Sequence, residues 1–131
     1  MTTELRVRKI MTPDFVRLTR DVPIRRAVAQ LVDQAASAAP VIDADDTLCG
    51  ILTQKDCFGP VLEASYYQEW RGVVADFMTE GVVWVEAGQD VVGVAQTMMT
   101  SPHREFPVLE NGKLVGLLSR AAVLAALSRA G

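Results

Sequence analysis

The stretch GILTQKD, Gly50 to Asp56, has the pattern of a short apolar strand that runs directly into a helix. A near-copy, GLLSRAA, follows at Gly116 to Ala122. In both stretches the expected helix opens on a hydroxyl residue, which is a preferred N-cap. The first copy has an acid three residues after its Thr, whereas the second has Ala122 at that place. The chain therefore repeats one local design with one chemical difference.

The similarity extends outward from these stretches as an internal duplication. A shift of 67 residues places Ile10–Thr12 (IMT) over Phe77–Thr79 (FMT), and Ala39–Val41 (APV) over Phe106–Val108 (FPV). The offset falls to 66 after one turn, because DADDT in the first copy is one residue longer than ENGK in the second. A single length difference located in a turn is typical of a duplicated structural unit.

The first half of each copy predicts a strand followed by a helix. The strands are expected at Val16–Leu18 and Val82–Val85. The helices show apolar residues at i, i+3, i+4, i+7 and i+8, the spacing of one buried face. These residues are Ile24, Ala27, Val28, Leu31 and Val32 in the first copy, and Val91, Val94, Ala95, Met98 and Met99 in the second. Asp21 is expected to cap the first helix, with Pro23 in its first turn.

The second half of each copy predicts two strands and a closing helix. The strands are expected at Pro40–Asp43, Leu48–Leu52, Phe106–Leu109 and Leu114–Leu118. Asn-Gly joins the later pair, which is a strong hairpin signal, and the acids of the earlier turn read as solvated turn formers. The fold class is therefore α+β (α/β), built from two β-α-β-β-α repeats. Repeat 1 with its connecting segment is expected at residues 1–68 and repeat 2 at residues 69–131.

The segment between the copies carries two further signals. Gly59-Pro60 is expected to break or kink the helix that begins at Thr53. Tyr66, Tyr67 and Trp70 cluster beyond it. Either these rings cover the edge of the core, or they form a surface for self-association, since aromatic residues are enriched at interfaces.

Composition bounds the class of protein. The chain has 131 residues, of which 50% are hydrophobic and 22% charged, as in ordinary globular proteins. No apolar run approaches the ~20 residues of a membrane span, and the first residues lack the pattern of a signal peptide, so a cytoplasmic protein without a membrane partner is expected. The net charge of −3, with both signs interspersed, argues against a nucleic-acid partner. Cys49 and Cys57 read as thiols, and no cluster with metal-ligand spacing is present.

Taken together, these motifs resemble a tandem pair of CBS domains, also called a Bateman module. Each copy has a Met-Thr segment, an apolar-Pro-Val strand and a Gly-apolar-apolar-Thr/Ser ending, and the resemblance runs from about Arg8 to Ala126. It implies two repeats related by a pseudo-twofold axis, two clefts between them, and association into homodimers. It also implies a stand-alone sensor whose regulatory ligand is AMP, ADP, ATP or S-adenosylmethionine, with or without Mg²⁺, and whose occupancy is passed to an unknown protein partner.

The acid at Asp56 has two interpretations. With Thr53 it forms the pattern of a capping box, in which the acid accepts the N-cap amide. A helix N-terminus also suits a phosphate or its neighbouring hydroxyls, and the resemblance assigns this acid to the two hydroxyls of a ribose. Because Ala122 replaces the acid in the second copy, the fold does not require an acid there, which favours a role in ligand binding.

The resemblance then implies two unequal clefts. The first would bind a nucleotide through Thr53, Asp56, Ile51, Val82, Val83, His103, Arg104 and Pro107. Arg is a good bidentate partner for phosphate, although a solvated loop explains His103 and Arg104 equally well. The mirror cleft would use Phe15, Val16, Ser37, Ala38, Pro40, Ser119 and Arg120. It lacks the ribose acid and has Ser37 where the first cleft has Arg104, so it is expected to be weaker or empty.

Catalysis is not expected. The chain has one His and no pattern that pairs a nucleophile with a base, so neither a catalytic residue nor a cofactor is assigned. The sequence therefore predicts a regulatory module that binds an adenosine-containing ligand and modulates a partner or its own dimer. The alternative is a ligand-free scaffold for protein interactions.

Overall fold

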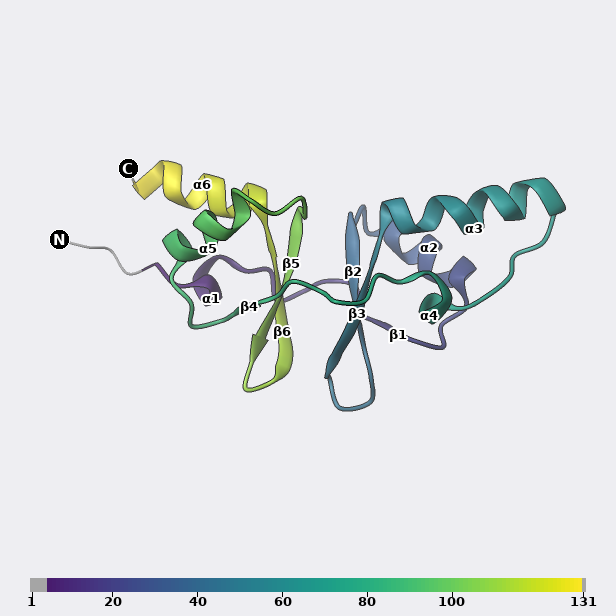
Figure 1. The fold of residues 1–131 in the computed structure, drawn as a ribbon, viewed down its shortest axis with the longest axis horizontal. Coiled ribbons are helices and arrows are strands. Elements are labelled where there is room, and N and C mark those ends of the chain that lie inside the picture. Colours follow the sequence, from purple (N-terminus) through teal and green to yellow (C-terminus); the bar gives the residue numbers. More distant parts are fainter. Residues whose placement is uncertain (1–4, 131) are drawn as a thin grey trace. The chain divides into compact units, whose positions relative to one another are not determined.

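The computed structural model describes residues 5–130, and within them one order of elements occurs twice (Figure 1). The first set is α1 (Val7–Ile10), β1 (Leu18–Thr19), α2 (Ile24–Asp33), β2 (Ala38–Ile42), β3 (Leu48–Thr53) and α3 (Gln54–Tyr67). The second set is α4 (Val74–Phe77), β4 (Val85–Glu86), α5 (Val91–Met98), β5 (Glu105–Glu110), β6 (Lys113–Ser119) and α6 (Arg120–Ala130). The predicted α+β class and the β-α-β-β-α order are confirmed, with one short helix added before each copy.

The compact units of the structure are not the copies seen in the sequence. One unit, called here the β1–β3 unit, contains Phe15–Val82. The other, the β4–β6 unit, combines the chain up to Asp14 with the chain from Val83 onward. Helix α4 of the second copy therefore belongs to the β1–β3 unit, and α1 of the first copy belongs to the β4–β6 unit. The division of the sequence copies at residues 68 and 69 stays a prediction.

Each unit holds a three-stranded sheet of the same topology. In the β1–β3 unit, β1 runs parallel to β2, with Leu18 opposite Val41, and β2 runs antiparallel to β3. In the β4–β6 unit, β4 runs parallel to β5, with Val85 opposite Val108, and β5 runs antiparallel to β6. The first strands begin later than predicted, because regular parallel pairing starts at Leu18 and Val85.

Both hairpin turns form as their sequences indicate. The Asp43 Oδ1 atom accepts the backbone N–H groups of Asp45 and Thr47 at 3.2 and 3.3 Å, which makes Asp43 a turn former. In the second hairpin, Asn111 and Gly112 have φ values of 53° and 77°, the left-handed pair that a tight hairpin turn requires.

The helical stripes are buried or partly buried except at their last positions. Leu31 and Val94 lie in the separate cores of the two units. Val32 and Met99, however, are 71% and 85% exposed, so their predicted burial is wrong. Val32 belongs to the last turn of α2, and Met99 is the C-cap residue of α5.

The predicted N-cap of α2 is wrong, and so is the predicted break at Gly59-Pro60, while a kink at that point stays a prediction. Asp21 does not cap α2; its carboxylate accepts the Thr19 hydroxyl at 2.8 Å, and Pro23 occupies the N-cap position because the helix starts two residues later than expected. Gly59-Pro60 does not break α3, which continues from Gln54 to Tyr67 (Figure 1). Pro60 leaves one turn without its N–H donor, but its ring is buried and packing compensates.

The aromatic cluster at the end of α3 contains one ring that fits the first interpretation and two that fit the second. Trp70 packs against the core of the β1–β3 unit, as expected for a ring that covers a core edge. Tyr66 and Tyr67 are 84% and 67% exposed, with ring centroids 5.6 Å apart. These two rings therefore remain available to a partner.

Candidate functional site

Asp56 lies at the junction of β3 and α3, where the capping interpretation is confirmed. The Asp56 backbone N–H donates to the Thr53 hydroxyl at 3.2 Å, and the Thr53 backbone N–H donates to Asp56 Oδ2 at 3.0 Å. Two amide groups that a helix start leaves without partners are thereby satisfied. The carboxylate is fixed at the positive end of the α3 dipole, where a negative charge is favourable.

The same carboxylate has a second partner, which comes from a distant part of the chain. The Thr79 hydroxyl lies 3.3 Å from Asp56 Oδ1 and 3.2 Å from Oδ2, and it donates to this carboxylate. Thr79 belongs to the Met-Thr segment that follows α4. From the sequence, only a weak contribution of Thr79 to the first cleft was expected; the available signal was the recurrence of Met-Thr at the start of both copies.

The Met-Thr segment lies beside β3 because their backbones pair. The Ile51 N–H donates to the Thr79 carbonyl at 3.0 Å, and the Thr79 N–H donates to the Ile51 carbonyl at 2.8 Å. Gly50 permits this approach, since a Cβ atom there would stand 2.7 Å from the Met78 Sδ atom and 3.1 Å from the Thr79 carbonyl oxygen. The β1–β3 unit thus brings together Ile51, Thr53, Asp56 and Thr79.

The β4–β6 unit repeats this arrangement without the acid. The Thr12 and Leu117 backbones exchange two hydrogen bonds of 2.9 and 3.0 Å, and Gly116 lies against Met11. The Ser119 hydroxyl accepts the Ala122 N–H at 3.0 Å, as Thr53 does in the other unit. Because Ala122 has no polar side-chain atom, this site offers no carboxylate to a ligand.

The loops before β2 and β5 also correspond. The Arg104 carbonyl accepts the Arg120 N–H at 3.0 Å, and the Ser37 carbonyl accepts the Gln54 N–H at 3.0 Å. His103 is exposed and meets Phe106 edge to face, with ring centroids 6.3 Å apart. The Arg104 side chain is exposed as well, as both the phosphate-contact and the solvated-loop interpretations require.

The predicted site residues are distributed over both units. Of the first set, Ile51, Thr53, Asp56 and Val82 belong to the β1–β3 unit, whereas Val83, His103, Arg104 and Pro107 belong to the β4–β6 unit. Of the second set, Phe15, Val16, Ser37, Ala38 and Pro40 belong to the β1–β3 unit, whereas Ser119 and Arg120 belong to the β4–β6 unit. Within the first set, the structure shows direct hydrogen bonds between Thr53 and Asp56.

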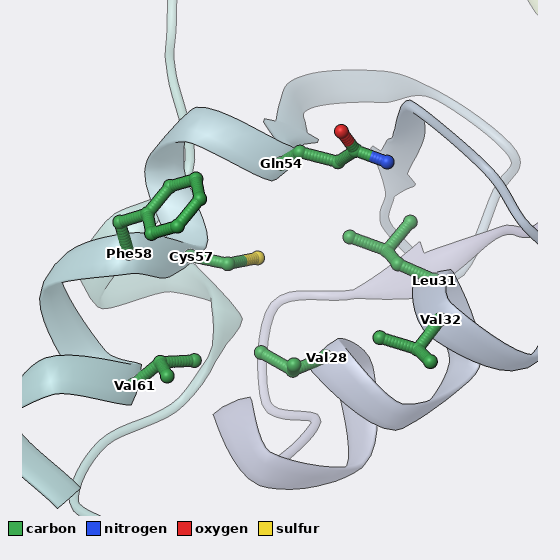
Figure 2. A pocket seen from close by; sticks show the side chains of 7 residues that line it. All are labelled: Val28, Leu31, Val32, Gln54, Cys57, Phe58 and Val61. Carbon is green, nitrogen blue, oxygen red and sulfur yellow. The ribbon is translucent and has the colours of Figure 1, made fainter. Parts of the chain in front are cut away.

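A separate pocket of ≈ 220 Å³ lies between α2 and α3 (Figure 2). Its lining is almost entirely apolar and consists of Val28, Leu31, Val32, Gln54, Cys57, Phe58 and Val61. Burial raises the pKa of the Cys57 thiol to about 11, and the negative charge of Asp56 acts in the same direction. A protonated thiol is a weak nucleophile, and the lining offers little to a ribose or a phosphate.

The described residues hold no group of three or more His, Cys, Asp or Glu side chains suited to a metal ion. Over residues 5–130, none of the helices combines the length and the apolar character of a membrane span. What the geometry supplies is a fixed carboxylate acceptor at a helix N-terminus, which suits the binding of a hydroxyl-bearing ligand.

Known proteins share both the sequence pattern and the fold. The family model described as CBS domain matches residues 7–62 and again residues 74–129. The protein YlbB of Bacillus subtilis is 31% identical over 117 residues, which cover 87% of this chain and 76% of YlbB. The protein MJ1225 of Methanocaldococcus jannaschii is 26% identical over 113 residues, and this match spans 86% of the chain but 39% of MJ1225.

A solved structure adds a relative with a bound ligand. The CBS-pair protein CBSX2 of Arabidopsis thaliana, crystallised in complex with AMP, is 26% identical and superimposes with a TM-score of 0.82. The match covers 95% of this chain and 97% of that one. The chain belongs to the CBS domain family and contains two copies of the domain.

Proposed function

We propose that this chain is a regulatory module that binds an adenosine-containing ligand, of the AMP, ADP, ATP or S-adenosylmethionine type, through the carboxylate of Asp56. The observation that carries the proposal is that two copies share the same strand, turn and hydroxyl cap, yet only one has the acid. A feature that the fold does without in one copy is best explained by binding. The AMP complex of CBSX2 supports the choice of ligand class.

The proposed ligand contacts follow from the chemistry of the side chains. Asp56 accepts the ribose hydroxyls, and hydrogen bonds to a charged group contribute about 1.5–3 kcal/mol each. His103 and Arg104 would meet phosphates, while Ile51, Val82, Val83 and Pro107 would meet the base. Mg²⁺ would accompany a ligand with several phosphates. The mirror set around Ser119 and Arg120 would bind weakly or not at all.

Ligand binding would act by shifting a population of states, since a ligand changes an equilibrium only by its difference in affinity for the two states. A homodimer is the simplest assembly for that response. Its support is a stripe of exposed apolar side chains at helical spacing on α3, formed by Phe58, Leu62 and Tyr66. The free thiols Cys49 and Cys57 suit a reducing compartment, which supports a cytoplasmic setting.

The same exposed stripe supports the second candidate, a ligand-free scaffold for protein interactions. Calorimetric titration of the purified chain with AMP, ATP and S-adenosylmethionine separates the two. The sensor requires heat with at least one ligand. If none of the three binds and the protein purifies without excess absorbance at 260 nm, the scaffold is the better description.

The decisive variant is Asp56→Asn, which retains an acceptor for the cap but removes the charge. We expect affinity to fall about 10- to 100-fold, since each 1.4 kcal/mol is a factor of ten. Asp76→Asn is the matched control, because Asp76 Oδ2 also accepts an amide at a helix start, from Val73 at 2.9 Å. If Asp56→Asn and Asp76→Asn lose ligand affinity equally, the assignment of Asp56 as the ribose acceptor is contradicted.

A further inference from the structure

We infer that Thr79 is a positioning residue of the ligand site, whose hydroxyl orients the Asp56 carboxylate before a ligand arrives. The inference rests on the proposed function of Asp56 and adds to the site a residue from the second sequence copy. Thr79 would act through Asp56 rather than on the ligand itself.

The distribution of partners over the carboxylate is the first argument. Oδ2 accepts the Thr53 N–H at 3.0 Å and lies 3.2 Å from the Thr79 hydroxyl. Oδ1 has the longer of the two Thr79 contacts, at 3.3 Å. A hydroxyl has one proton to donate, and a carboxylate oxygen has two lone pairs. Oδ1 therefore retains acceptor capacity for a ligand hydroxyl while Oδ2 is occupied by the protein.

The rigidity of Thr79 is the second argument. Its backbone exchanges two hydrogen bonds with Ile51, and the preceding Met78 N–H donates to the Val74 carbonyl at 2.9 Å. A donor held in this way restricts the rotation of Asp56. Ordering the carboxylate in advance lowers the entropy lost when a ligand binds.

The other unit provides a comparison within the same chain. Thr12 pairs with Leu117 as Thr79 pairs with Ile51, but Ala122 gives the Thr12 hydroxyl no carboxylate to orient. The Thr–acid pair thus occurs in the unit with the proposed ribose acceptor, while the backbone pairing occurs in both units. The backbone pairing explains the Met-Thr segment as structure, whereas the hydroxyl–carboxylate contact calls for a role at the site.

The test uses Thr79→Val, Thr79→Ser and Thr12→Val in the full chain, titrated with AMP. We expect Thr79→Val to weaken AMP binding about 3- to 10-fold, the effect of leaving one side chain to be ordered by the ligand. Thr79→Ser restores the hydroxyl and should bind within about twofold of wild type. Thr12→Val removes the corresponding hydroxyl beside Ala122 and should bind as wild type does. Thermal unfolding checks that each variant is folded.

A ligand-free measurement separates this inference from the proposed function. Three-bond NMR couplings of Asp56 report its χ1 rotamer; we expect one rotamer in wild type and Thr79→Ser, and averaging in Thr79→Val. If wild type binds none of AMP, ATP and S-adenosylmethionine, the proposed function fails at Asp56, and these couplings alone decide whether Thr79 orients the acid. The inference is overturned if Thr79→Val keeps a single rotamer, or if Thr79→Ser loses affinity as much as Thr79→Val does.

Discussion

Gly50 lies against Met78 so closely that a side chain at Gly50 would meet the Met78 Sδ atom at 2.7 Å. The Thr79 carbonyl oxygen would be 3.1 Å away, on a backbone that cannot turn aside as a side chain can. The missing side chain of Gly50 is therefore what lets the Met-Thr segment pair with β3 and bring Thr79 to Asp56.

Gly50→Ala should accordingly destabilise the protein. We expect the free energy of unfolding to fall by about 1–3 kcal/mol, the usual effect of overpacking, as measured by urea denaturation. Adding Met78→Ala should recover part of the loss. Gly93→Ala is the control: no atom lies within 4 Å of a Cβ atom there, and Gly93 is inside α5, so that variant should be more stable by about 0.5–1 kcal/mol. If Gly50→Ala leaves the free energy of unfolding unchanged, the Met-Thr segment and β3 separate easily.

Ala122→Asp should rebuild in the second copy what Asp56 provides in the first. The new acid completes a capping box with Ser119, which should stabilise the chain by up to about 1 kcal/mol. If the acid is also the ribose acceptor, calorimetry with AMP should show a second, weaker site per chain. Ala121→Asp places the same charge one residue earlier and should not create that site. Higher stability with unchanged stoichiometry would indicate that the acid acts only as a cap.

The stability of the chain should decline at high pH because of Cys57. Its folded pKa of about 11 lies above the ordinary value of 9.0, so above pH 9 the unfolded thiol ionises while the folded thiol stays protonated. Stability from this group is complete below pH 9 and is lost as the pH approaches 11. Urea denaturation at several pH values should show a steeper decline for wild type than for Cys57→Ala. Cys49→Ala should lose stability with pH as wild type does. If Cys57→Ala also declines as steeply as wild type, burial of the Cys57 thiol is not the cause of the decline.

Leu62→Glu tests the proposed homodimer. Leu62 is exposed in the middle of the apolar stripe of α3, and a charge there should convert a dimer to a monomer in sedimentation equilibrium. Glu63→Gln changes a charge at the neighbouring position and should leave the dimer intact. A dimer that survives Leu62→Glu would assign the interface to another surface, and a wild-type monomer at all concentrations would contradict the homodimer itself.

Much of the molecule could be predicted from local pattern. The duplication, the order of strands and helices, the hairpin at Asn111-Gly112 and the capping box of Thr53 and Asp56 depend on residues close together in the chain. Interactions of that kind appear in the sequence as spacing and residue type. The errors concern residues whose environment is not set by local spacing: α3 continues through Pro60, whose ring is buried, and Val32 in the last turn of α2 is exposed.

By itself, then, the sequence determined the family, the repeated unit and the acid that distinguishes one copy from the other. Only the tertiary structure decided that Thr79 donates to Asp56, that Gly50 admits Met78, and that each copy places its first short helix in the other copy's unit. The physical reason is that these contacts join residues 23 or more positions apart. Their partners are selected by the path of the backbone, and no spacing within either stretch encodes that path.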